Sequence, residues 1–224
     1  MGDQIESAKD VHNLIKKHNP EAKNLLELAC GTGSYLKYLS NYYNVCGLDT
    51  SSLMLSIANQ KTKKTPLFQA NMVNFKFDHS YDAIICMNDS INHLLKKSEW
   101  KKLFLNVSEH LNKNGIFIFD INTKFKLDNL NNSGPIVHEF DGNLFITSVV
   151  KKRVNNYEWN LKVFEEIKND QYRLHEETLY ESAFTVKEIK EILKNYFKKI
   201  KTYDLDTKKV SIKSQRIHFV CTKK

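Results

Sequence analysis

Residues 24–36, which read NLLELACGTGSYL, constrain the fold of this chain more than any other stretch. The segment begins with an almost continuous apolar run, as in a buried strand, and helical spacing resumes near Ser34. Between these parts lie small residues, among them Gly31 and Gly33, which leave the backbone nearly bare. The pattern predicts a strand, a tight turn and a helix whose N-terminus favours a carboxylate, a phosphate or hydroxyl groups.

The turn departs from the dinucleotide-binding pattern. The third glycine of GxGxxG, which lets helix and strand pack closely around a pyrophosphate, is replaced by Leu36. The residues present instead are acidic-x-small-x-Gly-x-Gly, with Glu27, Ala29, Gly31 and Gly33 at the defined positions. The turn therefore does not favour NAD.

Further apolar runs follow at intervals, each ending in a polar or sulfur-containing residue. Asp49 ends the second run at a spacing typical of an acid that binds the two hydroxyls of a ribose; the alternative role is a cap for the helix that follows. Asn71 follows the third run and Met87 ends the fourth. Such runs, alternating with helical patterns, predict a parallel sheet covered on both faces, with a ligand crevice at the carboxyl ends of its strands.

The pattern changes over about residues 136–180, where strict alternation replaces helical spacing. Turn signals at Asp141-Gly142 and Asn169-Asp170 indicate antiparallel hairpins. A helix with a Thr185–Glu188 capping box follows, and then a closing hairpin. We expect one domain, residues 1–224, with a β-hairpin insertion at about 136–180 that covers the substrate side or contacts another subunit.

Composition limits the partners of the protein. The 224 residues carry a formal net charge of +8, which is compatible with nucleic-acid binding, but the lysines are scattered in short pairs. No apolar run approaches the length of a membrane span, and the N-terminus is too polar for a secretory signal. The four cysteines are far apart in apolar runs, which favours reduced core residues of a cytoplasmic protein over a disulfide or zinc framework.

Five segments together resemble the class I S-adenosylmethionine-dependent methyltransferases: ELACGTG, GLDTSSLML, QANM, YDAIICMNDSINHL and LNKNGIFIFDIN. The resemblance implies a Rossmann-like α/β fold, a mostly parallel seven-stranded sheet with helices on both faces. Asn71, in place of the commoner Asp, would accept a hydrogen bond from the adenine amino group. The implied S-adenosylmethionine site consists of Glu27, Ala29, Gly31, Thr32, Gly33, Asp49, Thr50, Met54, Asn71, Met72 and Met87.

Within this family the chain is similar to small bacterial methyltransferases near the deoxyamino-sugar N,N-dimethyltransferases. The segments IESAKDVHNLI, CMNDSINHL, FDINTKFKL and SQRIHFVCTKK carry this similarity. Such relatives usually begin with a lid segment containing Tyr and Asp, which has no match in this sequence.

The polar turn after the fourth strand holds the catalytic candidates. Methyl transfer from a sulfonium is an in-line displacement, so the protein must mainly align the reacting atoms and exclude water. Asp89 or His93 would take a proton from an amine acceptor, with Asn88 and Asn92 positioning it. The alternatives are a helix cap at Asp89 and a partly buried structural histidine at His93.

We expect a small-molecule acceptor with an N or O nucleophile, no metal ion, and a monomer or homodimer. An RNA methyltransferase is the main alternative, supported by the net charge. However, the turn reads Asn88-Asp89-Ser90-Ile91 where enzymes acting on exocyclic base nitrogens place a Pro-Pro-aromatic turn. A cofactor-binding protein without catalytic activity is a third possibility.

Overall fold

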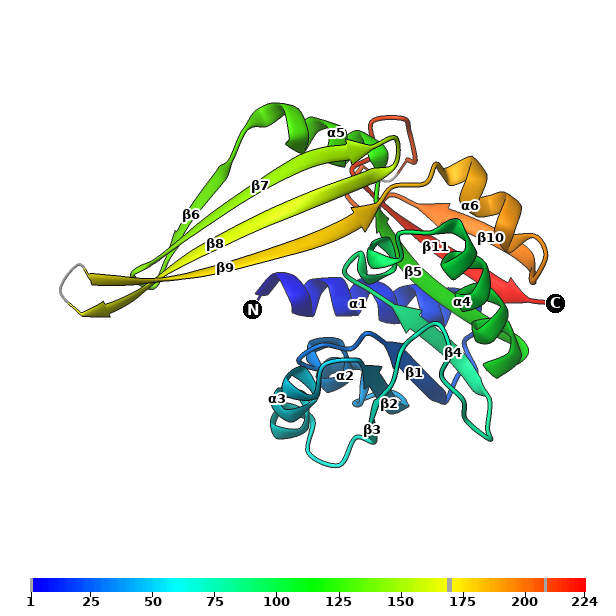
Figure 1. Cartoon of the computed structure of the whole chain (residues 1–224). Helices are drawn as coiled ribbons and strands as arrows, with labels where there is room; N and C mark the ends of the chain where they lie inside the picture. Colours follow the sequence, from blue (N-terminus) through cyan, green and yellow to red (C-terminus); the bar gives the residue numbers. More distant parts are fainter. Residues whose placement is uncertain (1, 169–170, 208) are drawn as a thin grey trace.

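A seven-stranded sheet forms the centre of the computed structural model, which describes residues 2–168, 171–207 and 209–224 (Figure 1). The strand order is β10-β11-β5-β4-β1-β2-β3, and β11 runs antiparallel to both of its neighbours. The strands of this sheet are β1 (Asn24–Leu28), β2 (Asn44–Asp49), β3 (Leu67–Gln69), β4 (Tyr81–Cys86), β5 (Leu111–Asn122), β10 (Phe197–Tyr203) and β11 (Arg216–Lys223). The predicted fold class is confirmed, including the closing hairpin.

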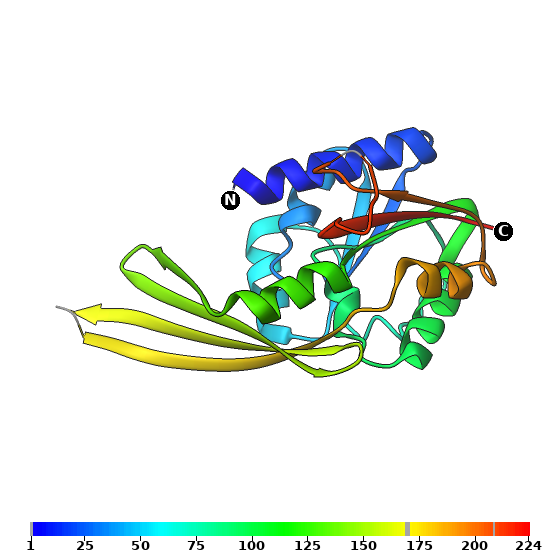
Figure 2. The same ribbon diagram turned by 90° about the horizontal axis from the view of Figure 1, so that it is seen from above.

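Helices cover both faces of this sheet, because alternate residues of each buried strand point to opposite sides. Leu26 and Ile84 pack with α4 and α6, whereas Leu25 and Ala83 pack with α1 and α2. Figure 2 shows α1 and α4 on opposite sides of the strands. The helices are α1 (Gly2–His18), α2 (Ser34–Leu39), α3 (Ser52–Thr62), the 3₁₀ turn η1 (Ser90–His93), α4 (Lys97–His110), α5 (Lys124–Ser133) and α6 (Val186–Leu193).

A second, four-stranded antiparallel sheet projects from the body in both views (Figures 1 and 2). Its strands, in spatial order, are β6 (Ile136–Phe140), β7 (Asn143–Arg153), β8 (Asn156–Lys168) and β9 (Gln171–Ser182). Leu127 of α5 packs with Val149 and Tyr157 at the base of this arm. The predicted antiparallel insertion is therefore present. Its hairpins join into one long sheet, and its last strand ends two residues beyond the expected 180.

All four cysteines are buried and unpaired, as predicted. No helix among the described residues is long and apolar enough to cross a membrane.

Candidate functional site

The turn between β1 and α2 brings bare backbone to the carboxyl edge of the sheet. Gly31 has φ +52°, and a Cβ built on it would meet no atom within 4 Å. Gly33 has φ +75°, and a Cβ there would lie 3.0 Å from the Cβ of Ala58. Both positions therefore need glycine, but for different reasons: Gly31 leaves open space for a ligand, and Gly33 lets α2 approach α3.

A cleft of about 630 Å³ opens beside this turn. Most of the expected site residues line it: Glu27, Ala29, Gly31, Thr32, Asp49, Thr50, Met54, Asn71, Met72, Asn88 and His93. Gly33, Met87 and Asp89 lie outside the lining: Gly33 packs on α3, and Met87 is only 3% exposed, within the core below α1. Ser34, Tyr35 and Leu179 also line the cleft, although the sequence did not indicate them.

Asp49 connects the end of β2 to the glycine turn. Its Oδ2 accepts a hydrogen bond from the Gly31 backbone N–H at 2.8 Å, and its Oδ1 accepts one from the Ser51 N–H at 2.9 Å. Ser51, rather than Asp49, is the N-cap of α3, because its side chain accepts a hydrogen bond from the Met54 N–H. Each carboxylate oxygen keeps lone-pair capacity, so Asp49 can still accept hydrogen bonds from a ligand.

Glu27 carries a buried carboxyl group at the floor of the cleft. The residue is 3% exposed, and its Oε2 has no hydrogen-bond partner among the described residues. Burial raises the pKa of Glu27 well above its ordinary value, and the Asp49 carboxylate adds to this effect. An unpaired buried polar atom costs free energy, so the position favours a ligand that brings a cation or a hydrogen-bond donor.

Asn71 lies at the rim of the cleft, after β3. Its Oδ1 accepts a hydrogen bond from the Val73 backbone N–H at 2.9 Å, which fixes the amide in place. The oxygen has a second lone pair, and the amide nitrogen has two donors. The side chain can therefore present both an acceptor and a donor to a ligand.

The turn after β4 has two successive left-handed residues, Asn88 with φ +57° and Asp89 with φ +51°. Asparagine and aspartate tolerate this conformation better than other non-glycine residues. The Tyr35 hydroxyl donates a hydrogen bond to the Asn88 Oδ1 at 3.2 Å, which holds the amide at the cleft. The turn therefore directs Asn88 into the cleft and Asp89 away from it.

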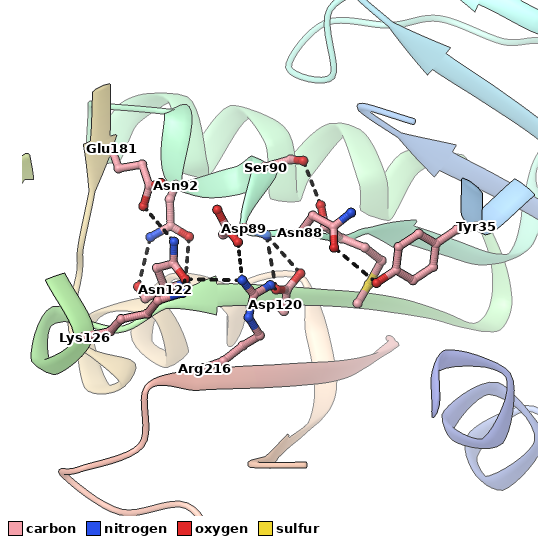
Figure 3. Close-up of polar contacts among 11 residues, drawn as sticks. Tyr35, Asn88, Asp89, Ser90, Asn92, Asp120, Asn122, Lys126, Glu181 and Arg216 are labelled. Atoms are coloured by element: carbon pink, nitrogen blue, oxygen red, sulfur yellow. Dashed lines mark hydrogen bonds and ion pairs between the residues drawn. The ribbon is translucent and has the colours of Figure 1, made fainter. Parts of the chain in front are cut away.

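Asp89 pairs with Arg216 instead of facing the cleft (Figure 3). The Arg216 guanidinium bridges Asp89 and the fully buried Asp120, and Asp120 also accepts the Asp89 backbone N–H. Burial alone would lower the pKa of Arg216, but the carboxylates of Asp120 and Asp89 outweigh it and raise that pKa. The guanidinium thus stays charged and holds the turn against β5.

His93 is exposed at the mouth of the cleft. Its Nδ1 lies 2.9 Å from the Tyr180 carbonyl oxygen. A carbonyl only accepts hydrogen bonds, so Nδ1 must carry the hydrogen, and in the neutral ring the lone pair is on Nε2. The histidine therefore joins the base of the arm to the site and keeps one nitrogen able to accept a proton.

Among the described residues there is no cluster of three or more His, Cys, Asp or Glu side chains that could hold a metal ion.

Comparisons of the sequence and of the structure with known proteins both find methyltransferases. A family model described as a methyltransferase domain matches residues 25–115. The crystal structure of a S-adenosylmethionine-dependent methyltransferase from Clostridium acetobutylicum superposes with a TM-score of 0.88 at 26% identity, covering 96% of this chain and 89% of that one.

Two further matches concern amino sugars. The dTDP-3-amino-3,6-dideoxy-alpha-D-glucopyranose N,N-dimethyltransferase of Streptomyces fradiae is 31% identical over 53% of this chain, and the match spans only 47% of that protein. The S-adenosylmethionine-bound amino pentose methyltransferase CalS10 of Micromonospora echinaspora has a TM-score of 0.80 at 19% identity, with coverage of 99% of this chain and 92% of that one. The match to CalS10 shows that the two proteins share a fold.

Proposed function

We propose that the chain is a class I S-adenosylmethionine-dependent methyltransferase, and that it transfers the methyl group to a small-molecule acceptor through a nitrogen or oxygen nucleophile. We further propose that residues 1–224 act as one methyltransferase domain, in which β6–β9 form an insertion. One observation carries the proposal: Glu27, Asp49 and Asn71, at the ends of β1, β2 and β3, all offer acceptor oxygens to one cleft.

The donor groups of S-adenosylmethionine match these acceptors. Glu27 would receive the ammonium group, Asp49 the ribose hydroxyls and Asn71 the adenine amino group, while Gly31 leaves room for close approach. The cofactor supplies a methyl group that its sulfonium has already activated. The protein then has to align the acceptor with this methyl group and exclude water.

We assign acceptor alignment to the turn after β4. Asn88 lines the cleft and is fixed by Tyr35, so its amide can orient an acceptor. His93 keeps Nε2 available to take a proton from the acceptor. Asp89 would act indirectly, because its carboxylate is held by Arg216 and secures the turn.

The relative from Streptomyces fradiae is named for a small amino-sugar derivative, which supports a small acceptor. Incubation with labelled S-adenosylmethionine and pools of small amines, alcohols and RNA tests this. We expect S-adenosylhomocysteine to form with a small acceptor. Methylation of RNA alone, strongly reduced by salt, would contradict the proposal and favour an RNA methyltransferase.

Gly31→Ala tests the cofactor site. The new methyl group would occupy the open space beside the turn, so we expect S-adenosylhomocysteine to bind about tenfold more weakly, as overpacking of about 1–3 kcal/mol implies. Gly134→Ala is the matched control, because Gly134 also has positive φ, +77°, with no atom near its missing Cβ, and does not line the cleft. Calorimetry giving equal affinities for both variants would contradict the cofactor assignment.

A further inference from the structure

A second hollow, of about 390 Å³, lies between the N-terminal half of α1 and the part of the sheet where β5 ends and β11 begins. It shares Gln4, Tyr35 and Asn88 with the cleft to which we assign the cofactor (the cofactor cleft), and the side chains of Tyr35 and Asn88 are hydrogen-bonded to each other. The two hollows therefore meet at the residue that we assign to acceptor alignment. We call the second hollow the carboxylate pocket.

The charges around the carboxylate pocket are unbalanced. Asp10 of α1 and Asp206 of the β10–β11 loop both line it, and neither forms an ion pair with any described residue. Burial raises the pKa of Asp10, and the charges of Glu6 and Asp206 raise it further. Arg216 also lines the pocket, but Asp120 and Asp89 already neutralise its charge. The pocket is thus net negative and favours a cation.

A second, independent feature is His218 of β11, which lines the same pocket. The residue is only 8% exposed, and its Nδ1 has no hydrogen-bond partner in the described parts of the chain. Burial and the Arg216 guanidinium lower the pKa of His218 to about 4, with Asp204 opposing them. Near neutral pH the ring is therefore uncharged, and its buried nitrogen needs a partner that the protein does not provide.

We propose that the carboxylate pocket binds the methyl acceptor, and that this acceptor is a compact cationic amine. His218 Nδ1 accepts a hydrogen bond from the amine, and Asp10 and Asp206 balance its charge. This inference rests on the proposed function and narrows it. The pocket is near the lower end of the range of ligand pockets, about 300–1,000 Å³, so the part of the acceptor inside it is small.

The same charges disfavour an anionic acceptor, such as a nucleotide-linked sugar, because its phosphates would face Asp10 and Asp206. For transfer, the bound ammonium first loses a proton, which passes to Nε2 of His93 in the adjoining cleft, as proposed above. The amine lone pair then forms the N–C bond as the S–C bond breaks. The nitrogen becomes an alkylammonium and the sulfonium becomes a neutral thioether.

Three six-membered-ring probes of similar size but different charge test the inference: cyclohexylamine, cyclohexanol and cyclohexanecarboxylate. Each is titrated into the full chain saturated with S-adenosylhomocysteine, and imidazole nitrogen signals are followed by NMR. We expect cyclohexylamine to bind most tightly and to shift the Nδ1 signal of His218, and the carboxylate to leave it unchanged. Tighter binding of the carboxylate, or no shift of His218 with the amine, would overturn the proposal.

Substitutions of Asp206 and His218 test whether the charge of the carboxylate pocket and the acceptor nitrogen of His218, and not only the shape of the pocket, determine amine binding. Asp206→Asn, on the exposed loop, should weaken cyclohexylamine binding by about threefold and leave cyclohexanol binding unchanged, as expected for an exposed ion pair. Asp78→Asn is the matched control, since Asp78 is exposed and outside the pocket. His218→Phe should weaken amine binding while His218→Asn, which restores an acceptor atom, recovers part of it. Equal amine affinity in Asp206→Asn and Asp78→Asn would also overturn the proposal.

The two proposals fail in different ways. Binding of S-adenosylhomocysteine is measured by calorimetry before any amine is added. Its absence would contradict the proposed function, whereas normal binding without preference for the amine would contradict only the assignment of the carboxylate pocket.

Discussion

At the scale of single residues, Glu27 shows a conflict between stability and binding. Its carboxyl group is buried at the cleft with one oxygen unpaired, which the ligand-free protein must tolerate. The folded state raises the pKa of Glu27, chiefly through burial, so it binds the proton more tightly than the unfolded state does. The residue therefore lowers stability as pH rises from its ordinary pKa towards the raised value.

Glu27→Gln should remove this pH-dependent cost. We expect the free energy of unfolding of the ligand-free variant to equal that of the parent at acidic pH and to exceed it as pH rises. The affinity for S-adenosylhomocysteine should fall by about tenfold or more, because a charge-assisted hydrogen bond is lost. Urea unfolding at several pH values and calorimetry check both effects. A variant that is less stable at every pH would show that the carboxylate serves the fold.

The residues of the cleft beside the glycine turn were largely predictable, because parallel strands end at one edge of the sheet and the residues after them converge there. Glu27, Asp49 and Asn71 all follow this rule. Arg216 and His218 do not, because they lie on β11, which runs antiparallel and brings its beginning to that edge. In the sequence their only signal is a polar residue at every second position of an apolar strand, Arg216-Ile217-His218-Phe219.

At the scale of elements, α5 and the arm were the hardest to foresee. Leu127 is the only buried residue of α5, so the helix has no apolar stripe to reveal it, and its start depends on the Thr123 cap. Alternation correctly predicted strands in the arm. However, all five residues of β6 are exposed, so the pattern gave no core-facing side from which the direction of the sheet could be inferred.

The base of the arm is tied to the site, and hydrogen exchange can test this. Leu179 of β9 lines the cleft beside the glycine turn, the Tyr180 carbonyl oxygen accepts a hydrogen bond from His93, and the Ser182 carbonyl oxygen accepts one from Asn92 at 2.8 Å. Saturation with S-adenosylhomocysteine should slow exchange in residues 179–182 by about tenfold, since β9 is an edge strand whose opening the ligand would oppose.

The far end of the arm provides the internal control. Residues 140–143 span the β6–β7 turn, away from the cleft beside the glycine turn, so their exchange should not change. Equal protection at both ends would indicate a global change in stability. Unchanged exchange in residues 179–182 would contradict the role of the arm as a cover of the site.

At the scale of the whole molecule, Arg216 joins segments that are distant in sequence. It begins β11, pairs with Asp120 on β5 and pairs with Asp89 after β4, so the closing hairpin is fastened to the turn of the site (Figure 3). Asp120 has no exposed surface, and without the guanidinium its charge would be left, among the described residues, with only the Asp89 backbone N–H as a hydrogen-bond donor. The same contact therefore supports both the fold and the geometry of the site.

Arg216→Met should lower the free energy of unfolding by about 3–5 kcal/mol, the usual cost of leaving a buried charge without its partner. Arg173→Met is the matched control, because its pair with Glu165 on the arm is 3.8 Å long and its side chain is 63% exposed, so the loss should be at most about 1 kcal/mol. Adding Asp120→Asn to Arg216→Met should restore part of the stability, since the unpaired carboxylate is then removed. Urea unfolding that gives the same small loss for both arginine variants would mean that Arg216 does not fasten the hairpin to the site.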